Sequence, residues 1–72
     1  MSKIVIDEKT RHGKPIVKGT RITVDEVLGM LEAGMSYEEI GKEYGLSKED
    51  IRAVISYAAS LVCGEEVHKV SA

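Results

Sequence analysis

One four-residue pattern occurs three times in the middle of this chain, and it fixes where helices can begin. Each copy has a serine or threonine followed three positions later by an acidic residue: Thr23 and Glu26, Ser36 and Glu39, Ser47 and Asp50. In such a capping box the hydroxyl accepts a hydrogen bond from the later residue's backbone N–H, and the acidic side chain reaches back to the N–H of the capping residue. The third copy has aspartate in place of the usual glutamate. The three copies predict three short helices.

Each predicted helix also carries an apolar stripe at helical spacing. The stripes are Val24, Val27, Leu28 and Leu31 in the first helix, Ile40 and Tyr44 in the second, and Ile51, Val54, Ile55, Ala58 and Val62 in the third. Glycines follow the stripes, as is typical where a helix ends in a left-handed cap. The expected helix ends are therefore Gly34, Gly45 and a position near Cys63.

The second and third predicted helices have the spacing of a helix-turn-helix. Its corner needs a small residue where the helices meet, here Gly41, and a residue that tolerates positive φ in the turn, here Gly45. Leu46 follows the turn and is expected to fill the corner. The buried side is completed by Ile40, Ile51 and Val54. This pattern indicates the motif more strongly than it indicates DNA binding, because helical hairpins of this shape also occur purely as structure.

The N-terminal residues 1–22 are expected to be extended. Two short apolar runs, Ile4–Ile6 and Ile16–Val17, flank a polar stretch that contains Gly13 and Pro15. They predict a small β-hairpin arm, which must pack on the helices or on another chain because a two-stranded hairpin is marginal alone. The predicted fold class is mostly α, with this arm before the helix-turn-helix core. The single predicted domain, 1–72, comprises the arm (1–22), the helical core (23–63) and a tail (64–72).

The length and composition of the chain exclude several classes of protein. The chain has 72 residues, no Trp or Phe and one Cys, which excludes an internal disulfide and a cysteine-based zinc cluster. So short a chain without a disulfide favours oligomerisation. The N-terminus does not resemble a signal peptide, and the weakly polar stretch Val54–Cys63 is too short to span a bilayer. A soluble cytoplasmic protein with no membrane association is expected.

Charge is distributed unevenly along the chain. Residues 1–23 carry a formal charge of +4 and residues 24–72 carry −6, within a net charge of −2. Such a division is typical of two surfaces with different partners. The alternative is that the basic arm pairs with the acidic helices of the same chain.

Candidate DNA contacts lie at the start of the third helix and on the arm. The second helix of a helix-turn-helix enters the major groove by its N-terminal end, where Arg52 could bind a guanine edge. The candidates for base or phosphate contacts are Ser47, Lys48, Arg52, Ser56, Lys14 and Lys18. Acidic neighbours would repel phosphate, and an intrahelical pair with Glu49 or a solvent-exposed position without a partner is at least as good an interpretation of Arg52.

Candidate protein contacts form an acidic set and an apolar set. The acidic candidates are Glu38, Glu39 and Glu43, expected on the outside of the second helix, and Glu49, expected near them across the turn. The third helix has an apolar arc much wider than the ~100° that one core requires. This arc predicts a homodimer or partner interface centred on Tyr57 and Leu61, unless the tail covers it through Val67 and Val70.

Nothing in the sequence indicates catalysis. His12 and His68 lie at opposite ends of the chain without further ligands at metal-binding spacing. There is no Ser/His/Asp set, and the glycines near Lys14 and Arg21 do not match a phosphate-binding loop. No catalytic, cofactor-binding or metal-binding residue is predicted, no cofactor is expected, and the chain is not expected to be an enzyme.

The run GKPIVKGTRITV, from Gly13 to Val24, resembles the signature of the bacterial and archaeal family called domain of unknown function 433. The match extends over most of the chain, from about Ile4 to Ala59. The resemblance implies a homeodomain-like helical core after a short β arm. It also implies a role like that of VapB-type antitoxins, which pair with PIN-like nuclease toxins. The motif positions it marks are Gly13, Pro15, Gly19, Thr20 and Arg21, with Gly19 shaping the turn and Arg21 holding the arm to the acidic helices.

Taken together, the residues and the resemblance predict a dimeric helix-turn-helix antitoxin of a type II toxin–antitoxin system. Its predicted partners are a nuclease toxin, whose basic rim the acidic residues would face, and its own promoter as double-stranded DNA. The alternative is a free-standing dimeric DNA-binding transcriptional regulator. A short nuclease-like reading frame overlapping this one favours the antitoxin, and its absence favours the regulator.

Overall fold

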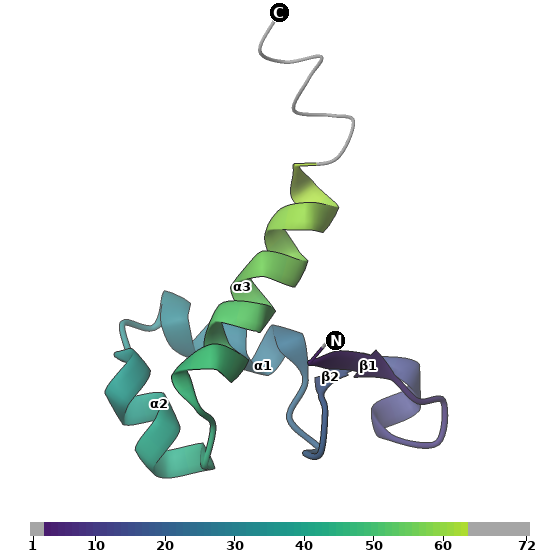
Figure 1. Cartoon of the computed structure of the whole chain (residues 1–72), viewed down its shortest axis with the longest axis horizontal. Coiled ribbons are helices and arrows are strands. Elements are labelled where there is room, and N and C mark those ends of the chain that lie inside the picture. Colours follow the sequence, from purple (N-terminus) through teal and green to yellow (C-terminus); the bar gives the residue numbers. More distant parts are fainter. Residues whose placement is uncertain (1–2, 64–72) are drawn as a thin grey trace, which may run out of the picture.

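The computed structural model describes residues 3–63 and shows three helices beside a two-stranded hairpin (Figure 1). The elements are β1 (Ile4–Ile6), the 3-10 turn η1 (Arg11–Gly13), β2 (Pro15–Val17), α1 (Val24–Glu32), α2 (Tyr37–Tyr44) and α3 (Lys48–Val62). This order confirms the predicted fold, which is mostly helical with a short N-terminal β-hairpin. The tail predicted for residues 64–72, with its cover through Val67 and Val70, lies outside the described residues.

All three capping boxes form, so the predicted helix starts are confirmed. At α1 the Thr23 hydroxyl accepts from the Glu26 N–H at 3.1 Å, and the Glu26 carboxylate accepts from the Thr23 N–H at 2.9 Å. The boxes of Ser36 and Ser47 have the same reciprocal bonds at 2.8 to 3.0 Å. The shorter aspartate side chain at position 50 therefore closes its box as completely as the two glutamates do.

The helix ends explain two of the glycines. At the end of α1, Gly34 has φ +94°, and the N–H groups of Gly34 and Met35 donate to the carbonyls of Leu31 and Met30 at 3.0 and 3.1 Å. This pair of bonds is the Schellman arrangement, which needs a residue in the left-handed region. Gly45 has φ +71° and ends α2 in the same conformation.

The corner between α2 and α3 has the close packing that the helix-turn-helix pattern predicts. A Cβ atom added to Gly41 would lie 2.8 Å from the carbonyl oxygen of Leu46, so only glycine fits there without movement of the backbone. The Leu46 side chain is buried under the corner. The corner therefore fixes the direction in which α3 leaves α2.

The hairpin is part of the core. Its strands are antiparallel, with Ile4 opposite Val17 and Ile6 opposite Pro15. A proline at the first position of a strand costs the ladder least. Strand β1 packs against α3 and β2 packs against α1, which buries Ile4, Ile16 and Val17.

The core ends before α3 does. It consists of Ile4, Val17, Val24, Val27, Ile40, Leu46, Ile51 and Val54. The C-terminal part of α3 projects from the other elements (Figure 1). The predicted core stripe is therefore wrong in its second half, because Ile55 is 36% exposed and Val62 is 69% exposed. Tyr44 of α2 is also more exposed than its stripe predicts, at 44%.

Candidate functional site

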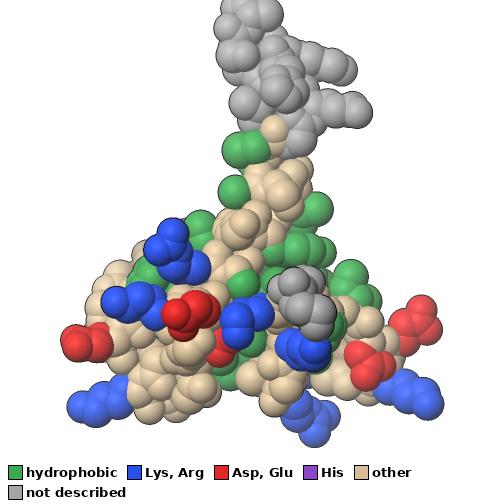
Figure 2. Space-filling model, in the orientation of Figure 1, with side chains coloured by type: hydrophobic (Ala, Val, Ile, Leu, Met, Phe, Trp, Pro, Cys, Tyr) green, Lys and Arg blue, Asp and Glu red, His purple; other side chains and the backbone are tan. Residues whose placement is uncertain are grey.

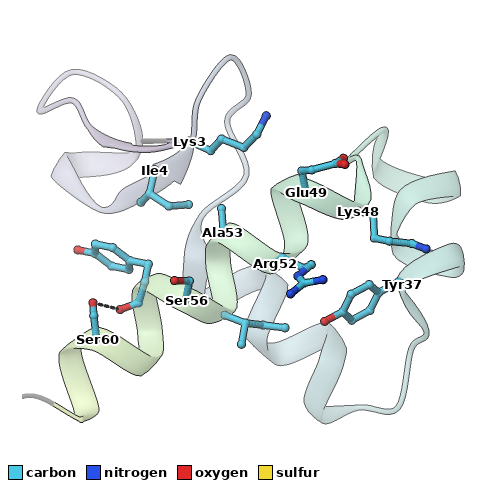
Figure 3. Close-up of a pocket in the computed structure, with 11 residues that line it drawn as sticks. Lys3, Ile4, Tyr37, Lys48, Glu49, Arg52, Ala53, Ser56 and Ser60 are labelled. Carbon is cyan, nitrogen blue, oxygen red and sulfur yellow. Dashed lines mark hydrogen bonds between the residues drawn. The ribbon is translucent and has the colours of Figure 1, made fainter. Parts of the chain in front are cut away.

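A shallow groove runs along α3 and contains half of the residues that the sequence marks as DNA contacts. It is lined by Lys3, Ile4, Tyr37, Lys48, Glu49, Arg52, Ala53, Ile55, Ser56, Tyr57 and Ser60. In the close-up, Arg52 extends from α3 toward Tyr37, whereas Lys3 lies on the hairpin side of the helix (Figure 3). Three cations and one acidic residue, Glu49, line this surface. The groove is therefore rich in hydrogen-bond donors.

The structure brings three of the six DNA candidates together in this groove. Lys48, Arg52 and Ser56 are exposed along one side of α3. Arg52 makes no ion pair with Glu49 within residues 3–63, so that alternative does not hold in this structure. Ser47 is also exposed, but its hydroxyl accepts a hydrogen bond from the Asp50 N–H as the cap of α3.

The two arm candidates are not part of the groove lining. Lys14 forms an ion pair with Asp25 at 3.3 Å, and both side chains are more than half exposed. The Lys18 side chain is exposed, and its backbone N–H donates to the Lys3 carbonyl at 2.7 Å. The arm is a closed hairpin packed on α1 and α3, which is not the free extended segment that a minor-groove arm requires.

Part of the positive charge of the arm is neutralised by acidic residues of the same chain. Three cations of the arm pair with acidic residues of the helices: Lys3 with Asp50, Arg11 with Glu26, and Lys14 with Asp25. The alternative that the arm pairs with the chain's own acids therefore holds for these three. Figure 2 shows Lys and Arg side chains interspersed with Asp and Glu side chains on the face of the molecule that it presents.

Arg11, rather than the motif residue Arg21, holds the arm to α1. The Arg11 guanidinium donates to both carboxylate oxygens of Glu26, at 2.9 and 3.3 Å, and to the Arg21 carbonyl at 2.9 Å. The Arg21 side chain is exposed and makes no ion pair in the described part of the chain. Sequence reasoning missed Arg11 because its reach depends on the loop, where Arg11 and His12 adopt the left-handed conformation with φ of +55° and +59°.

The same carboxylate caps α1 and binds the arm, and this lowers its pKa. The backbone N–H of Thr23 is the largest cause of the lowered pKa of Glu26, followed by the hydrogen bond from Arg11. The pKa of Asp50 is also lowered, chiefly by the backbone N–H of Ser47, with Lys3 adding to the effect. Both carboxylates are charged at neutral pH.

The motif residues Gly19 and Thr20 shape the turn between β2 and α1. Gly19 has φ +81°, as the turn requires. The Thr20 hydroxyl donates to the Val17 carbonyl at 2.8 Å and accepts from the Ile22 N–H at 3.0 Å. Gly13 also has a positive φ, of +79°, in the loop before β2. These residues shape the hairpin and its exit toward α1.

The acidic candidates differ in what their carboxylates do. All four side chains are exposed. Glu39 closes the capping box of α2 by accepting from the Ser36 N–H at 2.8 Å. Glu38 and Glu43 make no ion pair or hydrogen bond among residues 3–63, and Glu49 lines the α3 groove. The acids of α2 thus have no ion pair among the described residues, unlike Asp25 and Glu26 of α1.

The two apolar candidates for a partner interface differ in burial. Tyr57 is half-buried and packs against the core, whereas Leu61 is 67% exposed on the projecting part of α3. Ile55 and Val62 are the exposed apolar residues that the sequence reasoning assigned to the core instead. Their burial could not be inferred from periodicity, because the same spacing fits a stripe that the chain covers and one that it leaves open.

Residues 3–63 have neither a metal-binding cluster nor a helix that could span a membrane. Residues 3–63 contain no group of three or more His, Cys, Asp or Glu side chains that could hold a metal ion. The one cysteine, Cys63, is exposed and reduced. In the same part of the chain, no helix is both long enough and apolar enough to cross a membrane.

Comparison with known proteins identifies the family. The family model described as "Protein of unknown function (DUF433)" matches residues 4–58, from β1 to the middle of α3. The chain belongs to this family. The match contains the hairpin, the Gly19–Thr20 turn, α1, α2 and α3 as far as residue 58, so it includes every residue of the core.

This DUF433 chain resembles one named protein and one crystal structure from Mycobacterium tuberculosis. The protein named "Putative antitoxin VapB45" is 27% identical over 59 residues, which are 82% of this chain and 25% of the relative. The crystal structure of Rv2018 superposes with a TM-score of 0.66 at 29% identity, over 72% of this chain and 24% of that one. The chain thus spans about a quarter of the length of these relatives.

Proposed function

We propose that this DUF433 chain is an antitoxin module that binds and neutralises a nuclease toxin. The observation that carries the proposal is its similarity to VapB45, a protein named as an antitoxin, over 82% of the chain. Because the match covers 25% of the relative, the similarity concerns one module of it. What this module would contribute has to come from the surface of the chain itself.

The charges on α2 support a basic partner. The arm neutralises acids of α1 and of the start of α3, but it leaves Glu38 and Glu43 unpaired within the described residues. A nuclease binds polyanionic RNA and therefore has a basic rim around its active site. Exposed acids facing that rim would raise the association rate, and the rate would fall as ionic strength increases.

A co-expression rescue assay tests this proposal. A nuclease-like reading frame beside the gene is expressed alone, with this chain, and with the Glu38→Lys, Glu43→Lys double variant. We expect the unchanged chain to restore growth and the double variant to fail. Glu39 is left unchanged because it caps α2, and its loss would confuse a binding defect with a folding defect.

The matched control reverses two exposed acids elsewhere, Glu8 and Glu32, to lysine. It makes the same change in net charge, and it should retain full rescue. Circular dichroism of both variants checks that the helices persist. Rescue by a folded Glu38→Lys, Glu43→Lys variant would show that α2 is not the toxin-binding surface, and no rescue by the unchanged chain would refute the antitoxin function.

The α3 groove supports DNA binding as a second candidate function. Lys48, Arg52 and Ser56 lie together on the helix that a helix-turn-helix presents to the major groove. A mobility-shift assay with the upstream DNA at low salt tests it. We expect Arg52→Ala to weaken specific binding by ~1–3 kcal/mol and to relax base preference at one position. Lack of preference for the upstream DNA, with or without the toxin, would exclude a promoter reader.

A further inference from the structure

Ile55 is a large apolar side chain in the α3 groove, which is lined mostly by polar side chains. The other isoleucine of the groove, Ile4, is buried in the core, whereas Ile55 is 36% exposed. The chain itself therefore covers Ile55 only in part. A partner that fits this groove must offer negative charge to the cations and, beside that charge, a small apolar group to Ile55.

Ile55 shares one face of α3 with two cations of the groove, Lys48 and Arg52. At 100° per residue, these three positions fall within an arc of about 60°, whereas the acidic Glu49 lies about 120° around the helix from Ile55. Arg52 and Ile55 are three residues apart, so the helix rises by about 4.5 Å between them. In the close-up, Arg52 extends from the helix toward Tyr37 and not toward Glu49 (Figure 3). A single partner surface can therefore contact Arg52 and Ile55 together.

The major groove of duplex DNA combines the two properties that this face requires. Its phosphates attract the cations, and guanine presents two acceptors, O6 and N7, that an arginine can bind together. The apolar group on the base edges there is the C5-methyl group of thymine. Consecutive bases of one strand are separated by about 3.4 Å, which is close to the rise between Arg52 and Ile55. An arginine that binds a guanine therefore brings Ile55 to the neighbouring base pair.

We propose that Ile55 is a specificity-determining residue, which packs against the methyl group of a thymine in the base pair next to the guanine that Arg52 binds. Isoleucine neither donates nor accepts a hydrogen bond, so at this position it favours the base that carries a methyl group over the three that do not. This inference rests on the second candidate function, DNA binding by the α3 groove, and it names a base that this groove selects. It does not depend on the antitoxin function.

Selection of short duplexes from a random pool by the full chain provides the DNA probe. We expect the enriched site to contain a guanine with an A·T pair beside it. Arg52→Ala should relax the preference at the guanine, and Ile55→Ala should relax it at the neighbouring thymine only. A failure to enrich any sequence would overturn both DNA binding and this inference. An enriched site at which Ile55→Ala relaxes no thymine position would overturn this inference and leave DNA binding intact.

Replacement of that thymine by deoxyuridine removes the methyl group alone and tests the contact directly. At one fixed salt concentration, we expect the unchanged chain to bind the deoxyuridine duplex ~4-fold more weakly, as for the loss of one buried methyl group, and Ile55→Ala to bind both duplexes equally. Leu61→Ala is the matched control, because Leu61 is an exposed apolar residue of the same helix outside the groove lining, and it should keep the difference. Circular dichroism checks that both variants retain their helices. Equal binding of the two duplexes by the unchanged chain, or a difference that persists in Ile55→Ala, would overturn the inference.

Discussion

The two halves of α3 carry the same apolar pattern but have opposite environments. In the first half Ile51 and Val54 are fully buried beneath the hairpin, α1 and α2. In the second half the stripe continues through Leu61 and Val62, which are more than two-thirds exposed. The difference shows that periodicity defines which face of a helix is apolar, while the reach of the neighbouring elements decides how much of that face the chain can cover.

The first half is also tied down by polar contacts that the second half lacks. Its start is capped by Ser47 and Asp50, and the Asp50 carboxylate pairs with Lys3 of the arm at 3.4 Å. The corner at Gly41 and Leu46 fixes its direction. In the second half the described residues give one side-chain hydrogen bond, from the Ser60 hydroxyl to the Tyr57 carbonyl within the helix itself. The two halves should therefore respond differently to substitution.

The largest contrast is expected between truncations in the two halves. Ile51→Ala should lower the free energy of unfolding by ~2–5 kcal/mol, because it leaves a cavity in a fully buried site. Leu61→Ala should change the stability of the monomer by less than ~0.5 kcal/mol, because its side chain is largely exposed. Urea unfolding followed by circular dichroism measures both, at a protein concentration low enough to keep the chain monomeric. Similar losses in the two variants would mean that the second half is covered in the free chain.

The parts of the fold that follow from the sequence are those set by local contacts. A capping box requires only residues three positions apart, so all three helix starts are predictable. The Gly41 and Leu46 corner is equally local. The groove residues Lys48, Arg52 and Ser56 are predictable as well, because their spacing along one helix brings them together.

The features that escape sequence reasoning depend on contacts between distant segments. Arg11 reaches Glu26, fifteen residues along the chain, and this contact depends on the hairpin register and on two left-handed residues in its loop. The resemblance assigned this role to Arg21, which lies nearer to the helices in sequence. The exposure of Ile55 and Val62 likewise depends on where α1 and the hairpin stop.

A smaller contrast is expected between two glycines that lie on different helices. Gly41→Ala should destabilise the fold by ~1–3 kcal/mol, because its Cβ would meet the Leu46 carbonyl at 2.8 Å and the corner that directs α3 would have to shift. Gly29→Ala, within α1, has no atom within 4 Å of the new Cβ and should stabilise by ~0.5–1 kcal/mol. Thermal unfolding of the two variants measures the sign directly. A stabilising Gly41→Ala would show that the corner is looser than this geometry requires.

The smallest effect concerns the charge that anchors the start of α3, and it depends on pH. The pKa of Asp50 is lowered in the folded chain, first by the Ser47 N–H and then by contacts that include Lys3. A lowered pKa stabilises the fold when the pH is above the ordinary value of the carboxyl group, and this contribution is lost as pH falls through the lowered value. Asp50→Asn keeps an oxygen that can accept from Ser47 but removes the charge, so it should be less stable than the unchanged chain at neutral pH. The gap between their urea midpoints should narrow below about pH 4 and close in stronger acid. Because both chains keep Glu26, acid effects at that carboxylate cancel in the comparison. A gap that stays constant down to acid pH would show that the charge of Asp50 is not what stabilises the start of the helix.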